Sequence, residues 1–329
     1  MTNPRDVIVG VDLGGTSMRA LVVDADYQVL GEDKQPTNPK EKPVKLIADL
    51  ANVVEQAVER AGLKMKEVRA VSIGAPGAVD SERGIVFEAP NIRWRDVRLG
   101  AKLRKTLQVP VLVENDVNVG VVGEHVLGAG RGTKELVGIF VGTGIGGGII
   151  SRGRLYEGCR GSAGEIGHVV IQADGPRCGC GKRGCAEALA SRTAMERDVR
   201  AEIKAGHKSQ VLEIMKTRNR ERMTSSIVVR ALRKRDRVMR KVMARAEHYL
   251  GILVANIVNI LDPECVVIGG GLAERLQEDF VGPIRKTAYH YFLQQRGFER
   301  VSILPGQLGD QAGALGAAVL ARQRLRHTS

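Results

Sequence analysis

The chain has 329 residues, of which 43% are hydrophobic and only 3% aromatic. This length allows two domains or two lobes, with a core built mainly of Val, Ile, Leu and Ala. The sequence shows no basic region followed by an apolar stretch near its start, and no run approaches the ~18 apolar residues of a membrane span. We therefore expect a cytoplasmic protein without a membrane partner.

The formal net charge is +13, and the excess is concentrated in residues 216–245. Such a segment permits an acidic partner, but runs of like charge usually form a solvated helical surface, which is the interpretation we favour. The segment lacks interleaved aromatic residues, so no specific nucleic-acid partner is expected.

Strands and helices alternate in the first half of the chain. Residues 43–61 have the apolar spacing of an amphipathic helix, with Pro43 suited to its first turn and Gly62 to its end. The Glu114-Asn115-Asp116 segment follows a predicted strand and precedes a predicted helix. Apolar strands are predicted at 7–11, 17–23, 69–74 and 110–113.

A similar strand–glycine-turn–strand pattern returns about 130 residues later, at 136–151, which suggests two similar lobes. A long helix is predicted at 236–261, ended by Asp262-Pro263. A buried strand at 265–268 then leads into Gly269-Gly270-Gly271. Strands alternating with helices indicate an α/β fold.

Three glycine-rich turns are candidate nucleotide-binding elements. Glycines let backbone N–H groups approach phosphate oxygens, and a hydroxyl can add a further donor. In the first turn, Asp12 would hold Mg²⁺ through water. The second turn is followed by a strand, which argues against a Rossmann fingerprint. Plain chain reversals remain an alternative for all three. The candidate ATP-binding residues are Asp12, Gly14, Gly15, Thr16, Thr143, Gly144, Gly146, Gly147, Gly270 and Gly271.

Three cysteines lie within eight residues of one another, and His168 lies ten residues before the first. In a chain without an export signal, close-set cysteines bind metal more often than they form disulfides. Three thiolates and one imidazole make a closed tetrahedral site, which is typical of structural zinc. The predicted zinc ligands are His168, Cys178, Cys180 and Cys185.

Carboxylates stand close to this cluster and at the end of a strand. Glu165 and Glu187 flank the cysteine segment, and a zinc-ordered loop would present them to a polyol as hydrogen-bond acceptors. Asp116 has two interpretations: it caps a helix, or it accepts a proton from an alcohol.

Together, these segments resemble the ROK family of sugar kinases and sugar-responsive repressors over nearly the whole chain. The matching pieces are DLGGT at 12–16, GAPG at 74–77, END at 114–116, GTGIGGG at 142–148, GEIGH at 164–168, CGCGKRGCAE at 178–187 and GGGL at 269–272. Residues 89–97 look like the glucokinase branch of that family, with slightly different spacing.

The resemblance implies a two-lobed ribonuclease-H-like fold of the sugar kinase, Hsp70 and actin superfamily, with ATP and sugar in a cleft between the lobes. It places residues 1–116 in the first lobe, joined by a C-terminal helix at 311–329, and residues 117–310 with the zinc loop in the second. It further implies a homodimer or homotetramer.

The resemblance implies an enzyme that phosphorylates glucose at the 6-position with Mg·ATP. By motif position, Asp116 would be its catalytic base. The implied sugar contacts are Gly77, Asn115, Asp116, Glu165, His168 and Glu187. N-acetylglucosamine, N-acetylmannosamine or another hexose is the alternative acceptor. A ROK-type DNA-binding regulator is disfavoured, because only eleven residues precede Asp12 and leave no room for a helix-turn-helix.

Overall fold

The computed structural model describes residues 6–327, which form two compact units. The first unit runs to Gly132 and also contains Leu155–Ala163 and the chain from Asp310 onward; the second contains Thr133–Arg154 and Gly164–Gly309. The ranges expected for the two lobes were 1–116 together with 311–329, and 117–310. Residues 1–5 and 328–329 of these ranges lie outside the described residues.

Helix α3 (Asp116–Val126) belongs to the first unit because it packs closely on the C-terminal helix α11 (Ala312–His327). A Cβ atom at Gly316 would stand only 1.7 Å from the carbonyl oxygen of Val119, so the two helices can approach this closely only with glycine there. The C-terminal helix therefore belongs to the first unit.

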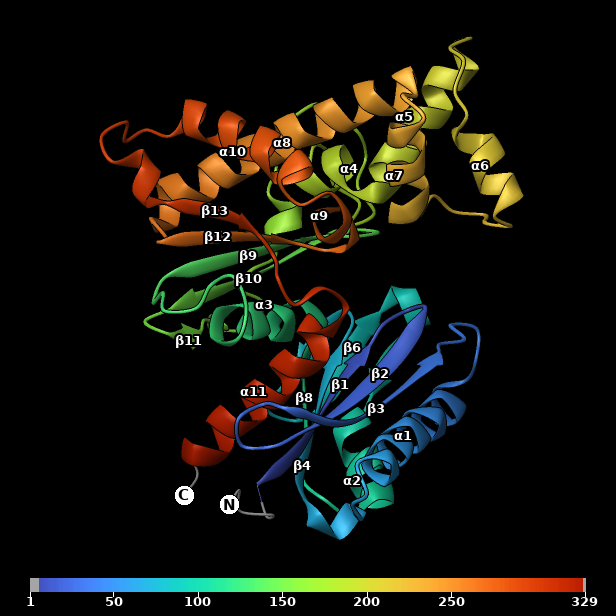
Figure 1. The fold of residues 1–329 in the computed structure, drawn as a ribbon, viewed down its shortest axis with the longest axis vertical. Helices are drawn as coiled ribbons and strands as arrows, with labels where there is room; N and C mark the ends of the chain where they lie inside the picture. Colours follow the sequence, from blue (N-terminus) through green and yellow to red (C-terminus); the bar gives the residue numbers. More distant parts are fainter. Residues whose placement is uncertain (1–5, 328–329) are drawn as a thin grey trace. The chain divides into compact units, whose positions relative to one another are not determined.

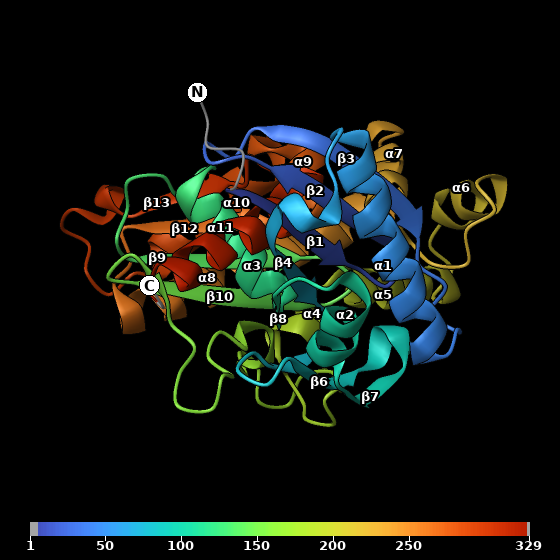
Figure 2. The ribbon, with the colours of Figure 1, turned by 90° about the horizontal axis from the view of Figure 1, so that it is seen from below.

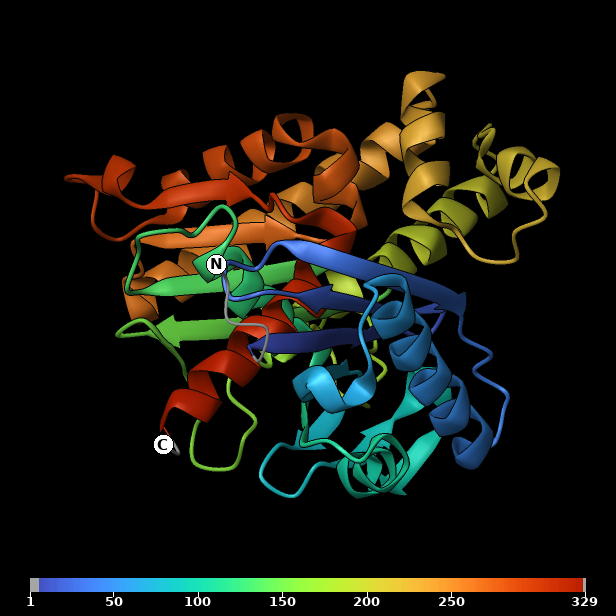
Figure 3. The same ribbon diagram turned by 60° about the horizontal axis from the view of Figure 1, so that its bottom comes forward.

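The first unit is built on a five-stranded sheet in the order β3-β2-β1-β4-β8. β1 and β2 are antiparallel, whereas β1, β4 and β8 are parallel. Figure 2 shows α3 and α11 on one side of the sheet and α1 and α2 on the other, and α1 runs along the strands (Figure 1, Figure 3). The bounds are β1 Val7–Leu13, β2 Ser17–Val23, β3 Val29–Pro36, α1 Pro43–Arg60, β4 Val68–Ala75, α2 Leu99–Leu107 and β8 Val111–Asn115.

A small antiparallel sheet of β5 (Ala78–Asp80), β6 (Ile85–Ala89) and β7 (Trp94–Val97) also belongs to the first unit. The buried Trp94 begins β7 and packs into the apolar core of this unit. The core otherwise consists mainly of aliphatic side chains, as the low aromatic content predicted.

The second unit repeats the same topology with the order β11-β10-β9-β12-β13. β9 and β10 are antiparallel, and β9, β12 and β13 are parallel. In both sheets, the first hairpin carries one of the predicted glycine turns, which confirms the duplicated pattern. The bounds are β9 Leu136–Val141, β10 Ile145–Ser151, β11 Arg154–Leu155, β12 Cys265–Gly269 and β13 Ser302–Pro305.

The second unit also contains seven α-helices, α4 to α10. Figure 1 shows α8 and α10 side by side, next to the sheet of this unit. The long helix α8 begins after Asp236, whose carboxylate accepts from the backbone N–H of Met239 at 2.8 Å and so caps it. The helices are α4 Ala186–Ala190, α5 Arg192–Lys204, α6 Val211–Thr217, α7 Ser225–Arg233, α8 Arg237–Leu261, α9 Gly271–Leu276 and α10 Glu278–Tyr291.

The strand order and directions of each unit confirm the expected ribonuclease-H-like α/β fold. The β-sheets are aliphatic and buried, with helices supplying the remaining core of each unit. Nowhere in residues 6–327 does a helix combine the length and the apolar character that crossing a bilayer requires.

The basic segment 216–245 contains the last residues of α6, the whole of α7, the first turns of α8 and the loops between these helices. Its arginines and lysines are exposed, as expected for a solvated surface. Part of its charge is neutralised by α5, since Arg222, Lys241 and Arg245 pair with acidic side chains of that helix. Those acids are Glu196, Glu202 and Asp198.

Burial raises the pKa of Glu247, in α8, from 4.5 to about 7. The folded protein thus holds this proton more tightly than the unfolded chain, so the stabilisation is greatest below pH 4.5 and is lost as pH rises through 7. We expect Glu247→Gln to raise the free energy of unfolding at pH 8 by about 2 kcal/mol, after discounting for partial exposure, and to change it little at pH 5.

Urea unfolding at the two pH values measures this difference. The exposed Glu55 of α1 offers a control, because Glu55→Gln should alter stability little at either pH. An equal effect of Glu247→Gln at pH 5 and pH 8 would contradict the assignment.

Candidate functional site

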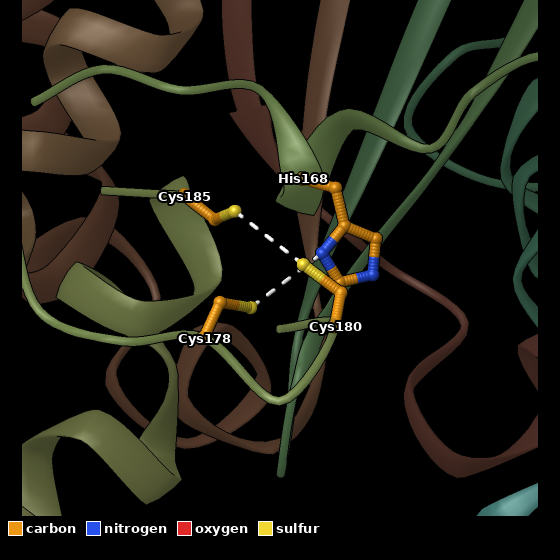
Figure 4. Close-up of side chains that lie close together, drawn as sticks. All are labelled: His168, Cys178, Cys180 and Cys185. Carbon is orange, nitrogen blue, oxygen red and sulfur yellow. Dashed lines mark hydrogen bonds between the residues drawn. The ribbon is translucent and has the colours of Figure 1, made fainter. Parts of the chain in front are cut away.

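The four predicted metal ligands converge within the second unit (Figure 4). Their ligand atoms all lie within 4.8 Å of one another, although His168 is ten residues from the nearest cysteine. The His168 Nδ1 atom is 3.7 Å from Cys178 Sγ, and the Sγ atoms of Cys180 and Cys185 are 3.7 Å apart.

These distances fit a tetrahedral zinc site. Zn–S bonds of about 2.3 Å and Zn–N bonds of about 2.0 Å, at tetrahedral angles, separate two sulfurs by about 3.8 Å and a sulfur from a nitrogen by about 3.5 Å. A disulfide would require about 2.0 Å between sulfurs, so the Sγ atoms of Cys180 and Cys185 are too far apart to form one. The donor set therefore suits zinc, and all four positions are filled by protein.

The short cysteine loop is shaped by its own backbone. The N–H of Cys178 donates to the carbonyl of Lys182 at 2.8 Å, and the N–H of Gly181 donates back to Cys178 at 3.0 Å. Burial raises the pKa of the Cys178 thiol to about 12, whereas a backbone N–H from Lys182 lowers the pKa of Cys180. A bound cation would favour the thiolate at each position.

Glu187 links the cluster of His168 and the three cysteines to the second glycine turn. Its Oε1 lies 3.5 Å from Cys178 Sγ, and its Oε2 accepts from the backbone N–H of Ile145 at 3.1 Å. Glu165 is exposed, and its Oε2 lies 4.0 Å from Nε2 of His168, the ring nitrogen that faces away from the sulfurs. Both predicted sugar-contacting acids are therefore next to the cluster.

The first glycine turn lies in the first unit, between β1 and β2. The N–H of Gly14 donates to the carbonyl of Ser17 at 2.9 Å, and Thr16 is exposed. Gly15 is close to Asn91 of the 89–97 segment. Burial raises the pKa of Asp12 to about 6 against the opposing effect of Arg19, so a cation beside Asp12 would stabilise its ionised form.

Asn115, rather than Asp116, caps helix α3. Its Oδ1 accepts from the N–H groups of Val117 and Asn118, at 2.9 and 3.1 Å, and its Nδ2 donates to the carbonyl of Gly77 at 3.0 Å. Gly77 has φ of +87°, and a Cβ there would meet the Glu88 carbonyl at 2.0 Å, so only glycine fits.

Asp116 is the first residue of α3 and is partly exposed. Its Oδ1 accepts from the N–H of Val117 at 2.9 Å. Because Asn115 already supplies the cap, the helix does not depend on Asp116 for its first turn. This removes the main reason for reading Asp116 as a capping residue only.

The second and third glycine turns lie in the second unit, after the neighbouring parallel strands β9 and β12. Carboxyl ends of parallel strands are where ligands bind in α/β sheets. Gly142 closes its turn by donating to the carbonyl of Gly144 at 2.9 Å, and Gly270 has φ of +92°. The predicted residues Thr143, Gly144, Gly146 and Gly147 belong to the β9–β10 hairpin, and Gly270 and Gly271 to the β12–α9 turn.

The sequence patterns missed two groups of residues. Arg192 and Thr193 both donate hydrogen bonds to Thr143, about fifty residues earlier in the chain. Arg192 Nη2 donates to the Thr143 Oγ1 atom and Thr193 Oγ1 to the Thr143 carbonyl oxygen, each at 2.7 Å. In the first unit, Arg324 bridges Glu114 at 2.6 Å and Glu157 at 2.7 Å, next to the Asn115-Asp116 pair. Neither group carries a local motif, so only the tertiary fold reveals them.

The chain matches the family model described as "ROK family" over residues 8–324. It belongs to the ROK family. A glucokinase from Thermotoga maritima is 36% identical over 326 residues, which cover 98% of this chain and 99% of the glucokinase.

Other proteins are similar over most of this chain. The structure of a ROK family glucokinase from Streptomyces griseus in complex with glucose and AMPPNP matches with a TM-score of 0.84 and 34% identity, over 96% of this chain and 99% of its own. A xylose repressor from Caldicellulosiruptor bescii is 30% identical over 95% of this chain and 77% of the repressor. Relatives of this chain thus include both glucokinases and a repressor.

Proposed function

We propose that this protein is an ATP-dependent hexose kinase that converts glucose to glucose 6-phosphate. The observation that carries this proposal is the 36% identity to a glucokinase along essentially the full length of both chains. The glucokinase with bound glucose and AMPPNP, similar over 96% of this chain, supports the same substrate pair.

In this proposal, Asp116 accepts the proton of the sugar C6 hydroxyl as that oxygen attacks the γ-phosphorus in line, and ADP leaves. The partly exposed carboxylate and the independent capping by Asn115 support this role. Gly77, Asn115, Glu165, His168 and Glu187 are the proposed sugar contacts. Asp12 is the residue proposed to hold Mg²⁺, which would neutralise charge on the phosphates when bound with the nucleotide.

Zinc is proposed as a structural ion held by His168, Cys178, Cys180 and Cys185. Its chemistry would be to fix the loop, since a closed ligand set leaves no open position for substrate. The Glu187 carboxylate, in contact with both the cluster and the β9–β10 turn, would then be held in place for a sugar hydroxyl.

An ADP-release assay with glucose, mannose, fructose, N-acetylglucosamine and N-acetylmannosamine tests the substrate. Glucose should show the highest kcat/KM, because the 89–97 segment resembles the glucokinase branch. A higher kcat/KM for N-acetylglucosamine would overturn glucose but keep the kinase class. A different outcome is specific, tight DNA binding with no ADP formed in the presence of any of the sugars. That outcome would favour a regulator instead, the class of the xylose repressor that this chain also resembles.

A further inference from the structure

Arg192, the first residue of α5, carries a guanidinium group that is partly buried. Its Nη2 donates to Thr143 Oγ1 at 2.7 Å, and its Nη1 donates to Ser225 Oγ at 3.4 Å. Within residues 6–327, no carboxylate lies at ion-pairing distance from this group. A partly buried cation without a counter-ion within reach is stabilised by an added anion, so the site favours one.

The surrounding charge points the same way. Burial lowers the pKa of Arg192, and the positive charge of nearby Arg222 lowers it further. Glu196 offsets part of this charge, but it already accepts from Arg200, Arg222 and the N–H of Met223. The region around Arg192 therefore keeps a net positive character that an added anion would stabilise.

Arg192 also joins the two glycine turns of the second unit. Its backbone N–H donates to the carbonyl of Gly142 at 3.0 Å, which attaches α5 to the β9–β10 turn. Its other partner, Ser225 Oγ, lies 2.9 Å from the place that a Cβ would take at Gly271, in the β12–α9 turn. The guanidinium thus stands where two neighbouring parallel strands end, the usual ligand edge of such a sheet.

The bond to Arg192 also sets the direction of the Thr143 hydroxyl. A guanidinium has only donors, so Thr143 Oγ1 must accept from it. The threonine proton is then free to donate elsewhere, and a phosphate oxygen is a strong acceptor for it. The same reasoning applies to the Ser225 hydroxyl.

We propose that Arg192 is a positioning residue for the phosphates of the nucleotide. It holds Thr143 so that the threonine hydroxyl donates to a phosphate oxygen, and its charge stabilises that anion. This inference rests on the proposed use of ATP, and it assigns a role to a residue outside the glycine motifs.

The test measures binding of Mg·ADP, adenosine and glucose to the full-length protein by calorimetry, together with KM for ATP and the melting temperature. Arg192→Gln should weaken Mg·ADP binding and raise KM for ATP about tenfold or more, while adenosine and glucose binding stay within twofold. Arg192→Lys should recover part of the loss, since it keeps the charge without the fork of donors.

Two further variants separate orientation from general charge. Thr143→Val should weaken Mg·ADP similarly, and adding Arg192→Gln to it should cost much less than the product of the two single effects. Arg230 is an exposed arginine of α7, so Arg230→Gln removes one positive charge and should change no binding constant by more than twofold.

Equal weakening of adenosine and Mg·ADP in Arg192→Gln would overturn the proposal, because a loosened turn affects both. Unchanged Mg·ADP affinity in a folded variant would overturn it too, even if sugar phosphorylation proceeds normally. If the wild type binds Mg·ADP with the expected Arg192 dependence but phosphorylates no sugar, the proposed function fails and this inference stands.

Discussion

Asp116→Asn should lower the turnover number for glucose about 10²–10⁴-fold, the contribution of a well-placed general base. Asn has nearly the same size and can still accept from the N–H of Val117, which Asp116 now does at 2.9 Å. It cannot take a proton from the sugar hydroxyl. Glucose should therefore still bind with a Kd within a few-fold of the wild-type value.

Steady-state kinetics and calorimetric glucose binding on one preparation measure both quantities. Asp279 offers a matched control, because it is an exposed acid in the first turn of α10. Asp279→Asn should keep full turnover. If Asp116→Asn also kept nearly full turnover, Asp116 would not be the base, and Glu165 or Glu187 would be tested next.

Cys180→Ser should release zinc and raise KM for glucose at least tenfold. A serine hydroxyl is a poor zinc ligand, and the loss of one of four ligands opens a closed site. Glu187 lies 3.5 Å from Cys178 Sγ, and His168 is itself a proposed ligand, so two proposed sugar contacts would lose their support. Outer-shell disturbance of this kind typically costs about 10–100-fold.

Metal analysis should find about one zinc per wild-type chain and much less in the variant. Cys159→Ser serves as the control, because Cys159 is an exposed cysteine outside the cluster. It should keep both zinc and sugar affinity. Wild-type protein that is fully active with no metal except added Mg²⁺ would exclude the site.

Much of the fold was predictable because local patterns and long-range packing agree. The helix at 43–61 and the strands at 7–11 and 136–141 have clear periodicity, and the structure places α1, β1 and β9 there. The edge strand β3 was not predicted, since its sequence VLGEDKQP is polar and lacks a regular alternation. The strands β5 and β11 were not predicted either, because three and two residues are too few to show a pattern.

The convergence of His168 and the three cysteines was predictable because these residues are close in sequence and chemically unusual for packing. The capping of α3 was not, since Asn115 and Asp116 are both good capping residues and only the structure shows that Asn115 occupies the N-cap position. Arg192 could not be found from the sequence either. Its significance depends on contacts with Thr143 and Ser225, which are distant along the chain.

The most direct test of the account is a ³¹P spectrum of the protein incubated with Mg·ATP and glucose. The proposed function predicts that the γ-phosphate signal of ATP declines while ADP and a sugar 6-phosphate appear in equal amounts. Asp116→Asn should slow this conversion by about 10²–10⁴-fold under the same conditions. Unchanged ATP with the wild-type protein, or ADP and inorganic phosphate without a sugar phosphate, would contradict the proposal.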